Sequence, residues 1–198
     1  MSWVEGADGS AYGIENLPYG VFGHGRSEPR IGVRIADFVL DLAAVEERGF
    51  LDGSGTLRAP TLNAFMALGR PAWDALRARL IELLTDEFYQ AALQHHLIAI
   101  EDVVMRLPFE VADYVDFYSS EQHAGNVGQI FRPGQPPLTP NWKHVPIGYH
   151  GRAGTVVASG TPIVRPCGQR KATDAAVPSY GPSTRLDIEA EVGFVVGV

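Results

Sequence analysis

The chain has 198 residues, 45% of them hydrophobic, with a formal net charge of -7 at pH 7, as expected for a globular protein with a sizeable core. The acidic balance, without any basic run, argues against binding to nucleic acid or to an anionic membrane, and no stretch approaches the ~20 apolar residues of a membrane span. Cys167 is the single cysteine, so no intrachain disulfide can form and a cytoplasmic protein is expected.

The first hundred residues show patterns of short strands and helices. Residues 30–42 (RIGVRIADFVLDL) are rich in β-branched residues and predict a hairpin that turns at Ala36 and Asp37. Thr61 is suited to cap a short helix that ends at Gly69.

A longer helix is predicted from about Pro71, which suits a first helical turn. Its apolar residues recur at steps of three or four, the pattern of a helix face turned toward a core. These residues are Trp73, Leu76, Leu80 and Leu84.

A first cluster of chemically active residues lies within residues 114–132 (YVDFYSSEQHAGNVGQIFR). The segment Ser119–Gln122 is a capping-box signature, which predicts a helix carrying His123 in its first turns. Asp116 and Tyr118 share a direction on the extended segment before it, because side chains two apart lie on one face. The three suit a metal ligand, a substrate contact and a general base. For His123 the alternative is a helix-surface or hydrogen-bonded core histidine.

A second cluster lies in residues 185–198 (RLDIEAEVGFVVGV). Apolar residues alternate there with Asp187, Glu189 and Glu191, which predicts a strand over residues 186–194 with the acids on one face. Neighbouring carboxylates repel, so a divalent cation held with a third acid from elsewhere is one interpretation. A solvated polar face of a half-exposed sheet is the other.

Taken together with PNWKHVPIGYHGRAGTVVASGTPI, NLPYGVFGHG and TLNAFMALGRPAW, these segments closely resemble the fumarylacetoacetase family. The resemblance extends over nearly every residue. It implies a mostly β fold with some α: a small SH3-like barrel domain with helices in residues 1–108, followed in residues 109–198 by the first part of a larger mixed-β catalytic domain.

The resemblance also implies a site and an activity. The activity is metal-dependent hydrolysis of a carbon–carbon bond of fumarylacetoacetate, the last step of tyrosine degradation, with Ca²⁺ or Mg²⁺ as cofactor and a homodimer as the full-length form. His123 would be the base that activates water. The implied metal ligands are Asp116, Glu189 and Glu191, and the implied substrate contacts are Tyr118, Arg132 and Tyr149.

Several alternatives stay open. Arg132 adjoins the proline-rich stretch PGQPPLTP, so it could instead be a loop cation. Tyr149 is flanked by Gly148 and Gly151, so it could instead be a loop aromatic that packs on the core. Because the family pattern continues beyond the glutamate pair, we expect an incomplete portion that is inactive alone. The other functions to weigh are those of an acylpyruvate hydrolase, an oxaloacetate decarboxylase, or a non-enzymatic interaction module.

Overall fold

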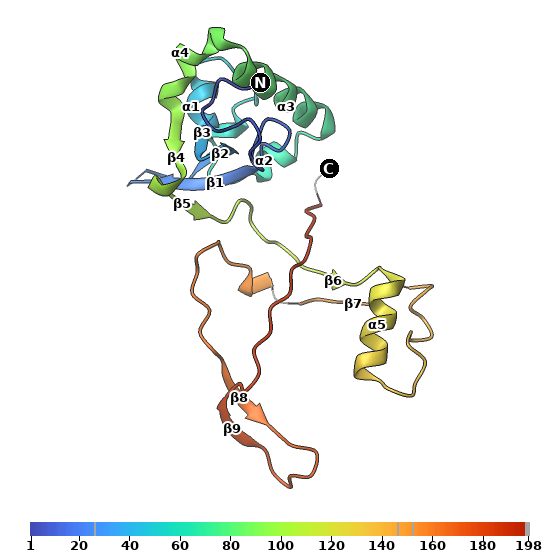
Figure 1. The fold of residues 1–198 in the computed structure, drawn as a ribbon. Coiled ribbons are helices and arrows are strands. Elements are labelled where there is room, and N and C mark those ends of the chain that lie inside the picture. The colour runs from blue at the N-terminus through green and yellow to red at the C-terminus, as the bar shows by residue number, and fades with distance from the viewer. Residues whose placement is uncertain (26, 146, 152, 197–198) are drawn as a thin grey trace. The chain divides into compact units, whose positions relative to one another are not determined.

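A computed structural model describes residues 1–196 except 26, 146 and 152. The chain divides into two compact units, one formed by Met1–Pro108 with Ala158–Val198 and the other by Phe109–Val157. Strands and helices occur in both (Figure 1). The described fold is therefore mixed β with some helix, while the division into domains at 1–108 and 109–198 stays a prediction.

The first unit contains a five-stranded antiparallel sheet in the order β4-β3-β2-β1-β5. The predicted hairpin is confirmed: Ile35 pairs with Phe38, and Ala36 between them has a φ of 49°. A two-residue hairpin loop requires such positive φ values to match the twist of its strands. The strands are β1 (Tyr19–His24), β2 (Arg30–Ile35), β3 (Phe38–Asp41), β4 (Leu97–Ala99) and β5 (Val103–Arg106).

The predicted long helix is confirmed as α3 (Arg70–Thr85), with Pro71 in its first turn. The predicted short helix is α2 (Asn63–Met66), but its N-cap is Leu62 rather than Thr61 and no side chain caps it. The other helices of this unit are α1 (Leu42–Glu47) and α4 (Gln90–Leu93). Short 3-10 turns are η1 (Thr56–Arg58), η2 (Glu87–Tyr89), η3 (Gln94–His96) and η4 (Ile100–Asp102).

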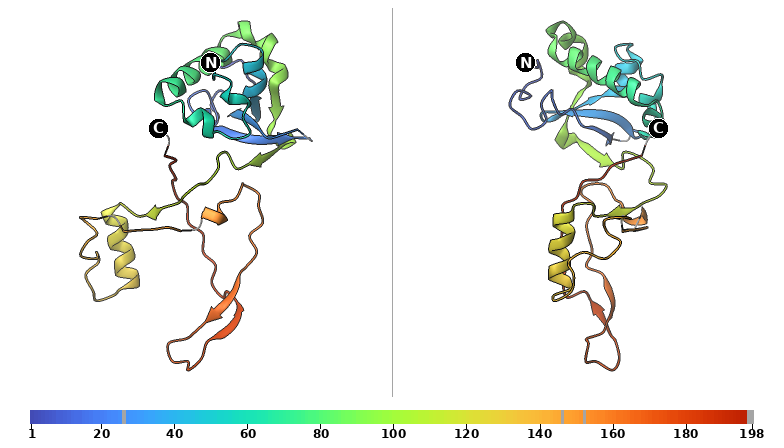
Figure 2. Two further views of the ribbon diagram at one scale, coloured as in Figure 1. Left: turned by 180° about the vertical axis from the view of Figure 1, so that it is seen from behind. Right: turned by 90° about the vertical axis from the view of Figure 1, so that its right-hand side faces the viewer.

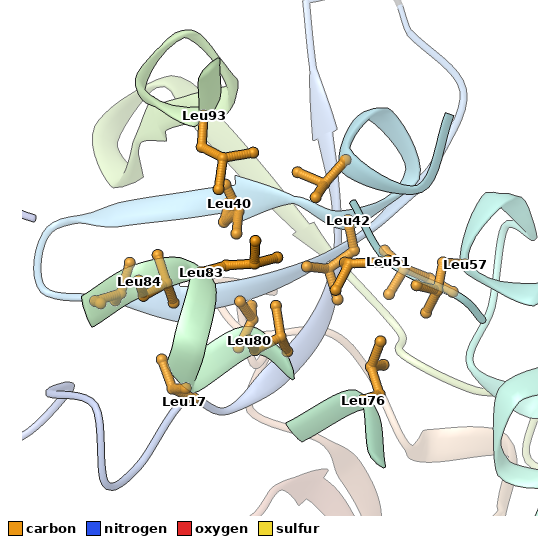
Figure 3. Packing of buried hydrophobic residues seen from close by; sticks show 14 of the residues in the cluster. Leu17, Leu40, Leu42, Leu51, Leu57, Leu76, Leu80, Leu83, Leu84 and Leu93 are labelled. Carbon is orange, nitrogen blue, oxygen red and sulfur yellow. The ribbon is translucent and has the colours of Figure 1, made fainter. Parts of the chain in front are cut away.

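The core of this unit lies between α3 and the sheet, as two further views show (Figure 2). Leucines of α3 point toward Leu40 of β3 and Leu42 of α1 (Figure 3). All of these side chains are buried, which explains why the helix repeats its apolar residues at three- and four-residue steps. The buried α3 leucines are Leu76, Leu80, Leu83 and Leu84.

The second unit consists of a short ladder, one helix and connecting segments. Strands β6 (Asp116–Phe117) and β7 (Gly148–Tyr149) pair antiparallel, and α5 (Glu121–Phe131) follows β6. The 3-10 turn η5 (Ala153–Thr155) comes after β7. In the described part of the chain, no helix is both long and apolar enough to cross a membrane.

Residues 158–196 contain one hairpin, formed by β8 (Cys167–Arg170) and β9 (Ser179–Pro182). The strand predicted over residues 186–194 is wrong for this structure, because the described residues there form no regular element. Ile188 is 92% exposed and Val192 98% exposed. A strand needs a neighbour to satisfy its backbone, and no described strand pairs with this segment. Its apolar row therefore has no sheet to cover it.

Candidate active site

The β6–β7 ladder joins two residues that lie 33 positions apart. Asp116 stands directly opposite Tyr149, and the Tyr149 hydroxyl donates a hydrogen bond of 2.6 Å to Oδ2 of Asp116. The ladder is tightly packed at Gly148, where an added Cβ would lie 3.3 Å from the Asp116 carbonyl oxygen. The interpretation of Tyr149 as a loop aromatic packed on the core is thus incomplete, because the residue is 62% exposed and its hydroxyl is hydrogen-bonded to an acid.

Helix α5 presents His123 in its first turn. Ser120 is the N-cap, and its hydroxyl accepts a hydrogen bond of 3.3 Å from the backbone N–H of His123. The predicted start of the helix is confirmed, although the capping hydroxyl belongs to Ser120 and not to Ser119. The imidazole is exposed and meets the Tyr118 ring edge-on, with ring centroids 6.2 Å apart. Tyr118 and His123 are therefore neighbours across the strand-to-helix junction.

Arg132 ends the same helix. Its backbone N–H donates to the Gly128 carbonyl at 2.8 Å, and its Nη2 donates to the Pro137 carbonyl at 3.1 Å. The side chain is half-buried and held against the following loop. The interpretation of Arg132 as a loop cation accounts for its position. A guanidinium has five N–H donors, so the bond to one carbonyl leaves further donors for a ligand.

A second pair, which sequence reasoning did not single out, lies beside the ladder. Nε2 of His150 is 2.5 Å from Oδ1 of Asp113. The N–H of Tyr114, and after it the charge and hydrogen bond of His150, hold the pKa of the Asp113 carboxyl below its ordinary value. No pattern in the sequence marks this pair, because the ladder that brings its two segments together is only two residues long on each side.

The predicted metal ligands come from both units. Asp116 belongs to the unit 109–157, whereas Glu189 and Glu191 belong to the other unit and are exposed. Within the described residues, no group of three His, Cys, Asp or Glu side chains is placed to hold a metal ion. The carboxylate oxygens are of the type that Ca²⁺ and Mg²⁺ prefer, and their joint role as metal ligands stays a prediction.

Five predicted site residues, then, belong to one unit and two to the other. The first set is Asp116, Tyr118, His123, Arg132 and Tyr149, and the second is Glu189 and Glu191.

Comparisons with known proteins identify the family. Residues 15–108 match the family model described as "Fumarylacetoacetase N-terminal", so the first unit contains a domain of that class. The chain is 46% identical over 208 residues to the fumarylacetoacetase of Caenorhabditis elegans, covering 99% of this chain and 49% of that protein. It is 45% identical over 211 residues to the Homo sapiens fumarylacetoacetase, covering 100% of this chain and 49% of that protein.

The chain belongs to the fumarylacetoacetase family and matches its amino-terminal portion. It spans about half the length of the curated relatives it matches.

Proposed function

We propose that this chain supplies the amino-terminal half of a fumarylacetoacetase, which hydrolyses fumarylacetoacetate to fumarate and acetoacetate. The observation that carries the proposal is the similarity itself, which extends over 99% of the chain and therefore beyond residues 15–108 into the unit that holds Asp116, His123 and Tyr149. The proposal also holds that the first unit is an SH3-like barrel and that this chain alone is inactive.

In this proposal His123 is the general base. Its imidazole is exposed at the start of α5, and imidazole is the side chain that most often serves as a general base, so it is suited to take a proton from water. The resulting hydroxide attacks a ketone carbon of the diketone. The carbon–carbon bond then breaks, the departing carbanion is delocalised onto the neighbouring carbonyl as an enolate, and a proton returns to give acetoacetate.

Tyr118, Arg132 and Tyr149 are the proposed substrate contacts. A guanidinium matches a substrate carboxylate through charge-assisted hydrogen bonds, and the phenols match carbonyl oxygens. The single donor of the Tyr149 hydroxyl is directed to Asp116. Donation to a substrate carbonyl therefore requires Tyr149 to exchange that bond, whereas accepting a hydrogen bond does not.

A divalent cation, Ca²⁺ or Mg²⁺, is the proposed cofactor, with Asp116, Glu189 and Glu191 as its oxygen donors. Such an ion supplies positive charge to a developing oxyanion when it is bound. Similarity to the family extends the proposal to a cytoplasmic homodimer acting on a small dicarboxylate diketone, without a nucleic-acid or membrane partner.

The test joins this chain to the carboxyl-terminal half of the Caenorhabditis elegans relative, whose matched region is 46% identical. The fusion is incubated with fumarylacetoacetate, an acylpyruvate and oxaloacetate, and the products are separated and quantified. The proposal predicts fumarate and acetoacetate from the fusion and none from this chain alone. Turnover of only the acylpyruvate or only oxaloacetate would reassign the substrate.

A further inference from the structure

Gly128 lies at a close approach between α5 and the loop that follows it. After α5 the chain turns back beside the helix toward β7, as Figures 1 and 2 show from three sides. A Cβ added at Gly128 would overlap the carbonyl oxygen of Pro137 and would lie 2.7 Å from its carbonyl carbon. Real Cβ atoms do not come so close to backbone, so any side chain at residue 128 displaces this loop.

Gly125 provides an internal comparison. It lies three residues earlier on the same helix, and no described heavy atom lies within 4 Å of a Cβ added there. The two glycines of α5 thus differ in the space around them, since only Gly128 lies against the following loop. Helix formation favours alanine over glycine at both positions by about 1 kcal/mol, but of the two only residue 128 has a neighbour outside the helix that a side chain would strike.

The Pro137 carbonyl, which lies in the space left by the missing side chain of Gly128, accepts a hydrogen bond from the Arg132 side chain. Nη2 of Arg132 donates to it at 3.1 Å and lies only 2.9 Å from the Cβ position of Gly128. The backbone of Arg132 is fixed as well, through the bond from its N–H to the Gly128 carbonyl. A third bond, from the Gln135 N–H to the Arg132 carbonyl at 3.1 Å, closes the turn.

We infer that Gly128 is a positioning residue for Arg132. By leaving room for the Pro137 carbonyl, it places a neutral acceptor on one edge of the guanidinium and so fixes the plane of that group. The rest of the planar fork is then preset for a carboxylate, which guanidinium groups bind through paired hydrogen bonds. This inference rests on the proposed function in one respect, the assignment of the substrate carboxylate to Arg132.

The experiment uses the 198-residue chain with alanine at residue 128 or, as the matched control, at residue 125. The Nε–H resonance of Arg132 is followed by ¹H–¹⁵N NMR, together with its heteronuclear NOE. Gly128→Ala should shift this resonance and increase its mobility, along with shifts confined to the backbone amides of Arg132, Gly134 and Gln135. Gly125→Ala should leave them in place. If Gly128→Ala leaves the Arg132 resonance and its NOE as in the wild type, the inference is overturned.

Fumarate titration tests the consequence for binding. Gly128→Ala and Arg132→Lys should each weaken fumarate binding by about tenfold, and the double variant should be no weaker than Arg132→Lys, because both changes act through one guanidinium. Additive losses in the double variant would contradict positioning through Arg132. Fumarate affinity that is unchanged in Arg132→Lys would instead refute the substrate role in the proposed function, while the NMR result still decides the positioning role.

A second variant covers the case in which Gly128→Ala does not fold. Arg132→Lys removes the planar fork without adding bulk to the helix. If the guanidinium and the Pro137 carbonyl hold each other, the backbone amide resonances of Gly134, Gln135 and Leu138 should shift in this variant. Unmoved resonances would overturn the inference.

Discussion

Asp41 makes two separate interactions, one with each carboxylate oxygen, and substitution can separate their contributions to stability. Oδ1 accepts a hydrogen bond of 3.1 Å from the backbone N–H of Ala44 and so caps α1. Oδ2 forms an ion pair with Nε of Arg30 at 2.5 Å. Asp41 is the charged residue of the buried set, at 7% exposure, while the Arg30 side chain is 30% exposed.

Asp41→Asn keeps the cap, because asparagine caps a helix about as well as aspartate, and removes the charge pairing. Breaking a fully buried pair costs about 3–5 kcal/mol, but partly exposed Arg30 can regain water, so we expect a loss of about 1–2 kcal/mol. Asp41→Ala also removes the cap, which adds about 1 kcal/mol and brings the loss to about 2–3 kcal/mol.

Urea unfolding followed by circular dichroism measures both losses. The control is Asp74→Asn, which disrupts the exposed ion pair with Arg70 on α3, where side-chain exposures are 59% and 78%. Exposed helix pairs contribute about 0.3–0.5 kcal/mol, so this change should be small. The reasoning is refuted if Asp41→Asn costs no more than the control, or if Asp41→Ala costs no more than Asp41→Asn.

Two further predictions concern titrating groups. Burial raises the pKa of Tyr19, whose hydroxyl has no hydrogen-bond partner among the described residues. The contribution of the neutral phenol to folding stability should therefore be fully present below its unfolded-state pKa, and it should be lost as the pH rises through the higher folded-state pKa. Tyr19→Phe should remove this alkaline loss of stability and leave the free energy of unfolding at neutral pH unchanged or up to about 1 kcal/mol higher. Urea unfolding midpoints measured at about pH 8–11 test this, and an equal fall of the midpoint with pH in both proteins would contradict it. The lowered pKa of Asp113 means that its carboxylate stabilises the folded state above its ordinary pKa, and that this effect is lost as pH falls through the lowered value. In a ¹³C NMR titration His150→Gln should raise the Asp113 pKa only in part, because the Tyr114 N–H remains the larger cause; no change at all would exclude a role for His150.

Local signals in the sequence sufficed for several elements. The hairpin at Ala36 and the helix α3 were predictable because a turn between β-branched runs and a stripe of leucines are encoded in consecutive residues. The start of α5 was predictable for the same reason. The choice of Ser120 over Ser119 as the cap was not, since the capping-box pattern is met by Ser119 with Gln122, whereas the backbone geometry selects Ser120.

Interactions between distant segments were harder to predict. The β6–β7 ladder is two residues long on each side, too short for alternation to reveal, yet it sets the contact between Asp116 and Tyr149. The Asp113 and His150 pair lies just outside this ladder and was hidden for the same reason. Residues 186–194 show the converse, because alternation indicates which face is apolar but cannot supply the neighbouring strand that would cover it.

The most direct test of the proposed function is the rate of fumarylacetoacetate hydrolysis by the fusion enzyme carrying His123→Ala. A general base contributes about 10²–10⁴-fold, so the rate should fall at least about 100-fold while the fold and the unfolding midpoint stay as in the unsubstituted fusion. The exposed His144 serves as the control, and His144→Ala should leave the rate unchanged. A His123→Ala enzyme that hydrolyses fumarylacetoacetate at the unsubstituted rate would contradict the account.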